Sequence, residues 1–472
     1  MKVRRTMGAA AVAMCAVVAL VGCSAPGSST APGSSTAPGS SVSSSAPGSS
    51  VSSSGSGQIT AKVTAADVAG LGQVTLNVLA DTGEEDVMKT FVPMYEGIYP
   101  NVKVDIQFLD WNDELKTDAN TAAGPNAPDV FQGAQGYTLD SVLVKDKLIR
   151  PLDDVASAYG WQDTYGSSTL SEFSWTADGK SFGSGDIYGM APVSSMVGVY
   201  YNKAKLQKLG LNVPTSYSEF VNDLAAAKAA GEVALVTGGS STSDLYHLFG
   251  AIQGASVNPQ DVRDWIAGKS GTTFVNSINQ DAMTTMQDWA TKGYFEPGVS
   301  GVARDDAVSM FANGTGVFMV EGTWEAPPVI KTNPSGFGFF AMPKGASGKY
   351  VAQGSMGMGW HITASSKKLA ADVAWIAMLL DQKNASVFVD DGRVPALSEG
   401  VQASNPRAQD TITASGQILS SGGNTYSFDW ATSTMDQTMG GAIQAVMAGH
   451  TQPSAALQEI QDDWAAFQSS RK

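Results

Sequence analysis

The sequence predicts an α/β fold that is divided into two lobes. Its 472 residues, of which 43% are hydrophobic, can bury a large core but exceed the length of one ordinary domain. Short apolar runs of strand length alternate with segments of helical periodicity, a pattern typical of parallel βαβ units. Cysteine occurs only as Cys15 and Cys23, so we expect neither an internal disulfide nor a thiolate metal site in the folded body.

The net charge of the chain argues against negatively charged partners of the folded part. The formal net charge is -15, and the first 22 residues contain three basic residues and no acidic one, so a chain that starts at Cys23 carries -18. Such an acidic body repels polyanions. We therefore expect no nucleic acid and no anionic membrane surface as a partner of the folded part.

Residues 1–22 have the three parts of a secretory signal peptide. Lys2, Arg4 and Arg5 precede an apolar run over residues 7–21 that is too short for a comfortable membrane span. The run ends in Leu-Val-Gly-Cys, which resembles the lipobox of bacterial lipoproteins. We expect cleavage before Cys23 and a lipid on this residue that anchors the protein to the outer face of the cell membrane. An ordinary secreted protein with an incidental cysteine is the alternative.

Residues 23–57 form a predicted flexible tether. After the cysteine they are almost entirely Ser, Gly, Ala, Pro and Thr, without a charged residue, and Ala-Pro-Gly-Ser-Ser recurs along them. This composition cannot form a core. A disordered segment of about 35 residues spans roughly 30 to 35 Å, which would hold the folded body near the membrane.

The folded part begins with three predicted strands. Residues 74–80 form an apolar run, residues 102–108 alternate as a strand should, and residues 128–131 give a third short strand. Between the first two, Met88, Phe91 and Tyr95 share one face of a helix whose first turn is acidic.

The remainder of the chain continues this alternation. We predict strands at residues 197–201, 233–236, 317–320 and 358–362, and a polar loop through Asp244, Tyr246 and His247 after the second of these. The predicted helices are one that starts at Lys203 and ends at Gly210, one that starts with a capping box over residues 216–219, one near residues 281–292, one with Leu369, Val373, Ile376 and Leu380 on a face, and one with Leu457, Ile460, Trp464 and Phe467 on a face. Trp265, Trp289, Trp375 and Trp464 lie in helical patterns, so we interpret them as packing residues.

Trp324 stands at a predicted strand-to-helix corner. The apolar run over residues 317–320 ends at Gly322 and Thr323, and a helix can begin beyond them. In open α/β sheets, ligands bind at such corners at the carboxyl ends of strands. Two interpretations stay open at this point: Trp324 is a ligand-binding side chain, or it is a core aromatic beside a structural glycine turn.

Several motifs, taken in their order, resemble family 1 of the extracellular solute-binding proteins of ABC importers, the group that includes the maltose-binding protein. They are Ala-Pro-Asp-Val at 127–130, Leu-Ile-Arg-Pro-Leu-Asp at 148–153, Tyr-Gly-Met-Ala-Pro at 188–192, Val-Tyr-Tyr-Asn-Lys at 199–203, the segment 314–324, and Arg-Val-Pro-Ala at 393–396. Each motif is weak alone, but their order behind a lipobox and a Ser-rich tether is specific. The resemblance covers roughly residues 74–467.

The resemblance implies a two-lobed, periplasmic-binding-protein-like fold in which each lobe is a mostly parallel sheet flanked by helices and a hinge joins the lobes. The N-lobe would comprise residues 72–190 and 345–392, and the C-lobe residues 193–342 and 393–472. The chain would cross between them near residues 190–193, 342–354 and 391–394.

The resemblance also implies a function. The protein would capture an oligosaccharide in the cleft between the lobes and deliver it to the permease subunits of an ABC transporter, whose separate ATPase supplies the energy. We expect no catalytic residue, no cofactor and no metal, and we expect a monomer.

A neutral sugar requires flat aromatic faces and polar side chains that satisfy its hydroxyl groups. The predicted strand-end loops are rich in both. The candidate ligand-binding residues are Asp81, Glu84, Asp110, Trp111, Gln132 and Tyr137 in the first lobe, Asp244, Tyr246, His247, Glu321, Trp324 and Trp430 in the second, and Gln353, Met356 and Arg393 near the crossings. The resemblance supports in particular the four aromatic residues Trp111, Tyr137, Trp324 and Trp430 and the segment from Gln353 to Met356.

Some alternatives remain. His247 and Arg393 also suit a purely structural polar role. Tyr246 and His247 stand where the maltose-binding protein has an acid and a tyrosine, so maltose specificity is not expected. An anchored glycoside hydrolase, an adhesive surface lipoprotein and a receptor for a non-sugar solute are the rival functions. No two acids stand in a recognisable catalytic setting, and the mixed aromatic loops favour carbohydrate.

Overall fold

The computed structural model describes residues 57–109, 122, 124–333, 335–398, 400–403 and 406–471. The predicted signal peptide, Cys23, the tether up to residue 56, and the candidates Asp110 and Trp111 lie outside the described residues. Among the helices of the described ranges, none combines the length and the apolar character that crossing a bilayer requires.

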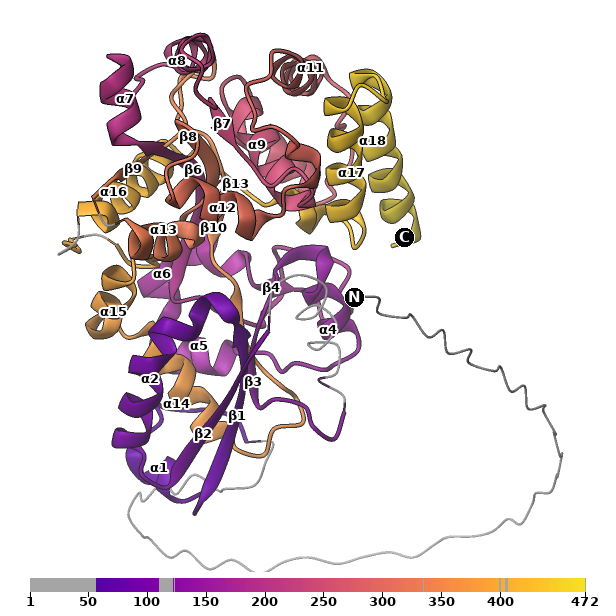
Figure 1. The fold of residues 1–472 in the computed structure, drawn as a ribbon. Helices are drawn as coiled ribbons and strands as arrows, with labels where there is room; N and C mark the ends of the chain where they lie inside the picture. The colour runs from indigo at the N-terminus through magenta and orange to yellow at the C-terminus, as the bar shows by residue number, and fades with distance from the viewer. Residues whose placement is uncertain are drawn as a thin grey trace, which may run out of the picture. The chain divides into compact units, whose positions relative to one another are not determined.

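The first sheet has four strands in the order β11-β3-β1-β2, of which β1, β2 and β3 are labelled in Figure 1. The strands are β1 (Val74–Asp81), β2 (Val102–Leu109), β3 (Val130–Gly133) and β11 (Gly359–Ile362). β1 is parallel to β2 and β3, whereas β11 is antiparallel to β3. The strands predicted at residues 74–80, 102–108 and 358–362 are thus confirmed, and the third predicted strand begins two residues later than expected.

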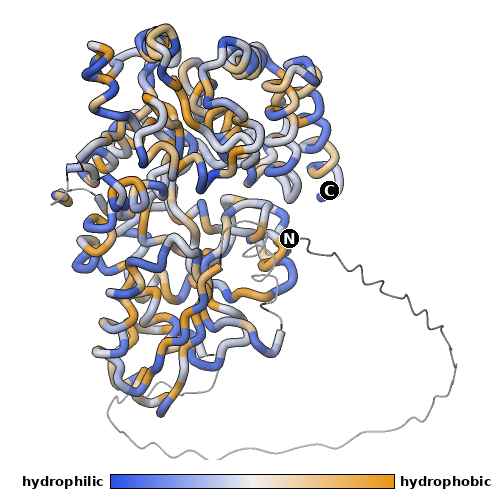
Figure 2. The backbone as a smooth tube through the Cα atoms, in the orientation of Figure 1, coloured by the Kyte–Doolittle hydropathy of each residue, from blue (hydrophilic) through white to orange (hydrophobic). Residues whose placement is uncertain are grey.

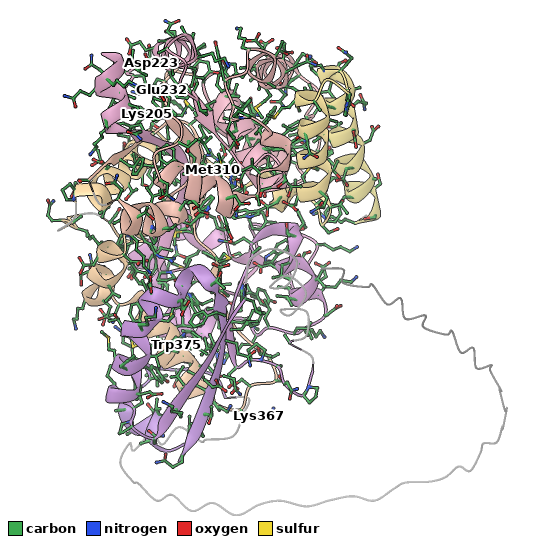
Figure 3. The ribbon with its side chains drawn as sticks, in the orientation of Figure 1. Lys205, Asp223, Glu232, Met310, Lys367 and Trp375 are labelled. Atoms are coloured by element: carbon green, nitrogen blue, oxygen red, sulfur yellow. The ribbon has the colours of Figure 1, made fainter. Side chains whose placement is uncertain are left out.

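The helices around this sheet bury its apolar residues. They are α1 (Ala65–Ala69), α2 (Glu85–Ile98), α4 (Asp140–Lys145), α5 (Asp153–Tyr159), α6 (Trp161–Ser171), α14 (Leu369–Leu380) and α15 (Ala385–Asp390). Met88, Phe91 and Tyr95 of α2 are buried, as their spacing predicts. The ring of Tyr95 lies 5.3 Å from that of Trp375 on α14, and its hydroxyl donates to the carbonyl of Ala371 at 2.8 Å. Trp375 is labelled in Figure 3.

The second sheet is mixed, in the order β13-β10-β6-β8-β7, with β9 and β12 also paired to β6. Its strands are β6 (Val193–Asn202), β7 (Leu235–Val236), β8 (Phe318–Gly322), β9 (Phe337–Phe340), β10 (Ala352–Met356), β12 (Val394–Pro395) and β13 (Asn424–Thr425). A separate ribbon joins β4 (Ser174–Trp175) to β5 (Asp186–Ile187).

The expectation of a mostly parallel sheet therefore holds for the first sheet and is wrong for the second. β6 is antiparallel to β8, β9, β10 and β12, and only β7 with β8 and β10 with β13 are parallel. Two neighbouring parallel strands need a crossover connection between them. The strands that pair with β6 come much later in the chain and run in the opposite direction.

The helices of the second part of the chain lie around this sheet (Figure 1). They are α7 (Lys203–Leu209), α8 (Tyr217–Ala229), α9 (Thr242–Gly254), α10 (Pro259–Ile266), α11 (Ser277–Thr291), α12 (Arg304–Ala312), α13 (Ala326–Thr332), α16 (Pro406–Ser420), α17 (Met435–Met447) and α18 (Pro453–Ser470). Gly210 ends α7 in the left-handed conformation. Ser216 caps α8, but the carboxylate of Glu219 accepts from Thr215, so the capping box is not completed as predicted.

The prediction of a polar loop through Asp244, Tyr246 and His247 is wrong, because these residues lie in the buried helix α9. Leu245, Leu248 and Ile252 recur at helical spacing, and this periodicity outweighs the polar residues between them.

The predicted packing tryptophans are confirmed. Trp375, Trp289, Trp265 and Trp464 are all buried. Hydrophobic stretches alternate with hydrophilic ones along the chain in the regions of both sheets (Figure 2). The indole N–H of Trp464 donates to the carbonyl of Trp265 at 2.8 Å, so this pair satisfies a polar group inside the core.

β6 brings the three predicted crossing segments side by side. Its residues Val193 and Ser194 pair with β12, and Ser194 to Met196 pair with β10. Gly354 in β10 has φ of 105°, and a Cβ there would lie 2.1 Å from the carbonyl oxygen of Ser195. Only glycine tolerates this close approach of two backbones.

The substitution Gly354→Ala should therefore destabilise the protein by about 1 to 3 kcal/mol, because it strains the backbone and forces β10 away from β6. Urea unfolding measures this loss. Gly416→Ala on the exposed side of α16, where nothing lies within 4 Å of the added carbon, is the matched control and should be neutral or stabilising. Equal changes in stability for the two variants would contradict the requirement for glycine at position 354.

Candidate ligand-binding site

Trp324 lies in a short 3-10 turn, Thr323–Glu325, between β8 and α13, so the predicted strand-to-helix corner is confirmed. Its ring covers the backbone of Gly322, where an added Cβ would lie 2.2 Å from the indole. The centroid of the His247 imidazole lies 5.2 Å from the centroid of the Trp324 ring. Trp324 is only partly buried, which distinguishes it from the four packing tryptophans.

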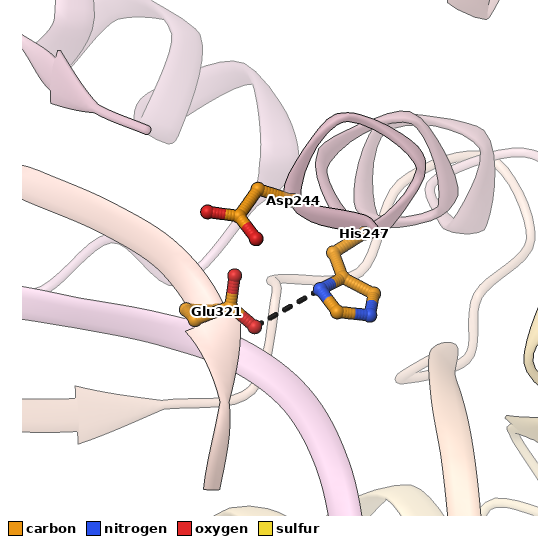
Figure 4. A group of neighbouring side chains, drawn as sticks. All are labelled: Asp244, His247 and Glu321. Carbon is orange, nitrogen blue, oxygen red and sulfur yellow. Dashed lines mark ion pairs between the residues drawn. The ribbon is translucent and has the colours of Figure 1, made fainter. Parts of the chain in front are cut away.

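A group of charged residues lies beside Trp324, and we call it the charged cluster. It comprises Asp244 and His247 of α9, Arg304 of α12, Glu321 of β8 and Glu325 of the turn. Nδ1 of His247 is 2.9 Å from Oε1 of Glu321, and Nε of Arg304 is 2.8 Å from Oδ1 of Asp244 (Figure 4 shows the first pair). Arg304 also lies 4.0 Å from Glu325.

Backbone groups hold the two central carboxylates in place. The N–H of Gly322 donates to Oε1 of Glu321 at 2.8 Å, and the N–H of Gly238 donates to Oδ2 of Asp244 at 3.1 Å. Asp244 and Glu321 are each only 2% exposed. Buried carboxylates need such partners, because an unpaired charge in the interior is costly.

Burial raises the pKa values of the carboxyl groups in the cluster, and nearby positive charge lowers them. Burial raises the pKa of Asp244 to about 6 and that of Glu325 to about 8, although Arg304 opposes both shifts. Burial also acts against ionisation of Glu321, but His247, Arg304 and the Gly322 N–H together bring the pKa of this carboxyl below its ordinary value. The cluster thus keeps Glu321 ionised at neutral pH and Glu325 largely protonated.

Three members of the cluster have ligand atoms of the kind that metals prefer. Single ligand atoms of Asp244, His247 and Glu321 lie within 4.8 Å of one another. However, the guanidinium of Arg304 already supplies a fixed positive charge at Asp244. This cation balances the carboxylates without a metal and would repel one.

A second group joins Glu84, Gln132 and Arg393. Arg393 NH1 lies 2.7 Å from Oε1 of Glu84, and Nε2 of Gln132 donates to the same oxygen at 3.3 Å. Oε1 of Gln132 accepts from the N–H of Asp81 at 3.1 Å. This network ties the carboxyl ends of β1 and β3 to the chain at β12, where the chain re-enters the second sheet.

A third group surrounds Tyr137 and Trp430, which are almost fully buried. The guanidinium carbon of Arg471 lies 4.1 Å from the centroid of the Tyr137 ring, and the Trp175 ring lies 5.1 Å away. Trp430 stacks on Tyr426 at 5.6 Å and packs on Gly136. Other protein groups thus cover the faces that were predicted to stack on a ligand.

The remaining described candidates have separate partners. The hydroxyl of Tyr246 donates to Asp436 at 3.3 Å, and Nε2 of Gln353 donates to Ser427 at 3.2 Å. The N–H of Met356 donates to the buried carboxylate of Glu172 at 3.1 Å. The Tyr246 ring lies edge-on to His247 of the charged cluster, with 5.1 Å between the centroids, whereas the partners of Gln353 and Met356 lie outside the cluster.

Sequence reasoning missed several residues of these groups. Arg304 and Arg471 carry no local signal for the contacts that matter here, because Asp244 lies 60 residues before Arg304 and Tyr137 lies far before Arg471 in the chain. Glu172 is likewise distant from Met356. Glu325 could have been identified, since it directly follows Trp324 at the predicted corner.

Arg304→Gln should destabilise the protein by about 3 to 5 kcal/mol, because it leaves buried carboxylates without their cation. Loss of Arg304 raises the pKa of Asp244 and Glu325 further, so the native variant binds more protons than its unfolded chain at neutral pH. The difference between the unfolding free energies of the wild type and Arg304→Gln should therefore increase as the pH rises from 5 to 8.

Urea unfolding across this pH range measures the effect. Lys292→Gln, which removes an exposed ion pair with Asp288, is the control and should leave the unfolding midpoint unchanged. A small deficit for Arg304→Gln that does not depend on pH would show that the carboxylates do not rely on this guanidinium.

The described fold is similar to those of solved sugar-binding proteins. A chitin oligosaccharide binding protein superposes with a TM-score of 0.72 and 19% identity over 84% of this chain and 99% of that chain. The maltose-bound MalE3 of T. maritima superposes with a TM-score of 0.66 and 18% identity over 83% and 99%. At these identities the likeness concerns the fold, and it confirms the predicted two-lobed, periplasmic-binding-protein-like architecture.

Two relatives are similar in sequence. The multiple sugar-binding protein of Streptococcus mutans is 24% identical over 220 residues, 46% of this chain and 52% of the relative. A probable sugar-binding periplasmic protein of Mesorhizobium japonicum is 26% identical over 287 residues, 60% of this chain and 64% of the relative. The match thus spans about half of the first relative and less than two thirds of the second.

A family model matches the chain over residues 77–386 and is described as bacterial extracellular solute-binding protein. This range covers well over half of the chain, from β1 into α15, and includes every member of the charged cluster and Trp324. The chain therefore belongs to the family of bacterial extracellular solute-binding proteins.

Proposed function

We propose that the protein is a receptor that captures an oligosaccharide between its two lobes and delivers it to the permease of an ABC transporter. The observation that carries this proposal is the partly exposed ring of Trp324 beside the buried, ion-paired carboxylate of Glu321. A separate ATPase would supply the energy for import. The receptor itself would act as a monomer without cofactor or metal.

The chemistry of this corner suits a sugar. The indole offers a flat apolar face to the C–H side of a pyranose ring, and the ionised carboxylate next to it accepts hydrogen bonds from hydroxyl groups. Glu321 already accepts from Gly322, but a carboxylate has lone pairs for further donors. The ion pairs hold these groups in place before the ligand arrives, which lowers the entropic cost of binding.

The lobes would divide the chain at the predicted boundaries, with hinge segments where β6, β10 and β12 pair. Thr138 donates to the carbonyl of Asp429, and Arg471 covers Tyr137. A ligand that reaches Tyr137 and Trp430 must replace these contacts. We therefore propose that the lobes separate there before the ligand binds.

The other candidates form the remainder of the proposed site. Asp110 and Trp111, which lie outside the described residues, are proposed as ligand contacts together with Glu84, Gln132 and Arg393. Asp244 and His247 would act through Glu321 and Trp324. Tyr246, Gln353 and Met356 are proposed as more distant contacts.

Two observations favour a carbohydrate receptor over the rival functions. The solved structures and sequence relatives named above carry sugar-binding descriptions. Within the charged cluster, the ion pairs of Glu321 with His247 and of Asp244 with Arg304 support a role as fixed hydrogen-bond acceptors. We propose capture without cleavage.

Trp324→Ala should abolish most of the affinity for an oligosaccharide while the melting temperature of the free protein changes by only a few degrees. Calorimetry with plant and host oligosaccharides, with product analysis, measures binding and excludes cleavage. Trp324→Phe should retain part of the affinity, since a smaller ring can still stack.

The buried Trp289 provides the matched comparison. Trp289→Ala removes a core side chain that is 1% exposed and should cost about 3 to 5 kcal/mol of stability. Similar destabilisation by Trp324→Ala would identify Trp324 as a core residue. If no oligosaccharide of the panel binds, or if a bound one is cleaved, the proposed function is wrong.

We further propose that a lipid on Cys23 anchors the protein to the outer face of the cell membrane, with residues 24–57 as the tether. In a bacterial host fed with a labelled fatty acid, the wild-type chain should carry the label and remain in the membrane fraction. Cys23→Ser should lose the label and appear in the soluble fraction or the medium. An unlabelled wild-type chain, or an unchanged distribution of the variant, would contradict the anchor.

A further inference from the structure

A cavity of about 450 Å³ lies at the edge of the first sheet opposite to the proposed sugar site. Its lining includes Ile362, which pairs with Val130 at the start of β3, whereas Gln132 and Glu84 lie near the carboxyl ends of β3 and β1. None of the residues that line it belongs to the three groups described above. The cavity is therefore a separate feature of the molecule.

Acidic groups dominate the polar lining of this cavity. Its titratable members are Arg150, Asp153, Asp154, Asp186 and Asp372. Arg150 and Asp154 form an ion pair at 2.7 Å, and Asp154 also accepts from the N–H of Ile59. In the described part of the chain, the other three carboxyls form no ion pair. The cavity consequently has an excess of negative charge and attracts cations.

Asp372 is the most unusual of these carboxyls. It is fully buried in α14, and its Oδ2 accepts from the hydroxyl of Ser366 at 2.7 Å. Its second oxygen, Oδ1, is buried and has no hydrogen-bond partner among the described residues. A buried acceptor without a partner costs free energy, so a donor that enters the cavity would be favoured at this position.

The lining of the cavity favours an organic cation over a metal ion. Among the described residues, the set of three neighbouring groups that could hold a metal ion consists of Asp244, His247 and Glu321, which lie outside the cavity. No three of the cavity carboxyls form such a set. The volume is in the range of sites for small organic molecules.

We propose that this cavity binds a small organic cation with two or more ammonium groups. One ammonium would donate to Asp372 in the interior, and another would lie between Asp153 and Asp186, which are exposed at the opening. A flexible molecule with two ammonium groups can donate to carboxyl groups that lie apart in the cavity. The sugar site, at the other edge of the sheet, would remain free.

Proton release accompanies this binding. Burial raises the pKa of Asp372 to about 8, and Asp129 adds to the rise, while Ser366, Lys368 and Arg150 oppose it. Lys368 is itself paired with Asp129 at 2.7 Å, and the hydroxyl of Tyr95 on α2 donates to the neighbouring carbonyl of Ala371. At pH 7 the carboxyl of Asp372 therefore holds a proton, and an ammonium that replaces it releases one proton to solvent.

The test is calorimetric titration of the full chain with 1,4-diaminobutane and with spermidine at physiological salt, in buffers of different ionisation heat. We expect saturable binding of one molecule, release of about one proton, and an affinity that rises about tenfold per pH unit below pH 8 and levels off above it. The uncharged 1,4-butanediol should not bind. Binding that is independent of pH would overturn the proposal.

Variants separate this site from the general attraction of an acidic protein for cations. Asp372→Asn keeps the size of the side chain and should weaken binding at least tenfold and remove its pH dependence. Asp186→Asn, at the exposed opening, should weaken it about threefold and provides the test should the buried variant fail to fold. Asp105→Asn on the exposed side of β2 is the control without effect.

Equal affinities of the wild type, Asp372→Asn, Asp186→Asn and Asp105→Asn would overturn the proposal, as would equally strong binding of Mg²⁺. Sugar binding by these variants should be unchanged. The two proposed sites can therefore fail independently of each other.

Discussion

The ten-residue strand β6 is the element on which the arrangement of the proposed site depends. Its second half pairs with β8, so that Gly198 lies opposite Glu321 and Val197 opposite Gly322. Its first half pairs with β10 and β12, which carry or adjoin Gln353, Met356 and Arg393. One continuous set of backbone hydrogen bonds thus determines where residues from three distant parts of the chain meet.

The charged cluster places several carboxyl groups in the interior, where their ion pairs add little to the stability of the fold. Desolvation opposes the ionisation of Asp244, Glu321 and Glu325, and Arg304 offsets part of this cost for all three. Hydrophobic residues of the same volume would be at least as stable. The cluster is consistent with a requirement for an ionised acceptor held beside Trp324, since ion pairs restrict the side chains that a flexible acid would leave mobile.

The two ends of the first sheet have different chemistry. At the carboxyl ends of β1 and β3, Glu84, Gln132 and Arg393 belong to one network, in which Arg393 also pairs with Asp391. At the opposite edge, Asp372 keeps a buried oxygen without a partner in the described chain. The first arrangement joins segments that are far apart in sequence, whereas the second leaves hydrogen-bonding capacity for a molecule that is not part of the protein. This contrast is the physical reason for assigning separate roles to the two ends.

Local patterns in the sequence determined much of the fold. The apolar runs at β1, β2 and β11, the helix face of Met88, Phe91 and Tyr95, and the corner at Trp324 all depend on residues close together in the chain. The polar residues of α9 misled this reasoning, although the spacing of Leu245, Leu248 and Ile252 was available. Only the tertiary structure decided that β6 is antiparallel to its neighbours, that Arg304 balances Asp244, and that Arg471 covers Tyr137. Hydrophobic periodicity reports which side of an element is buried, but it contains no information on which distant element packs against that side.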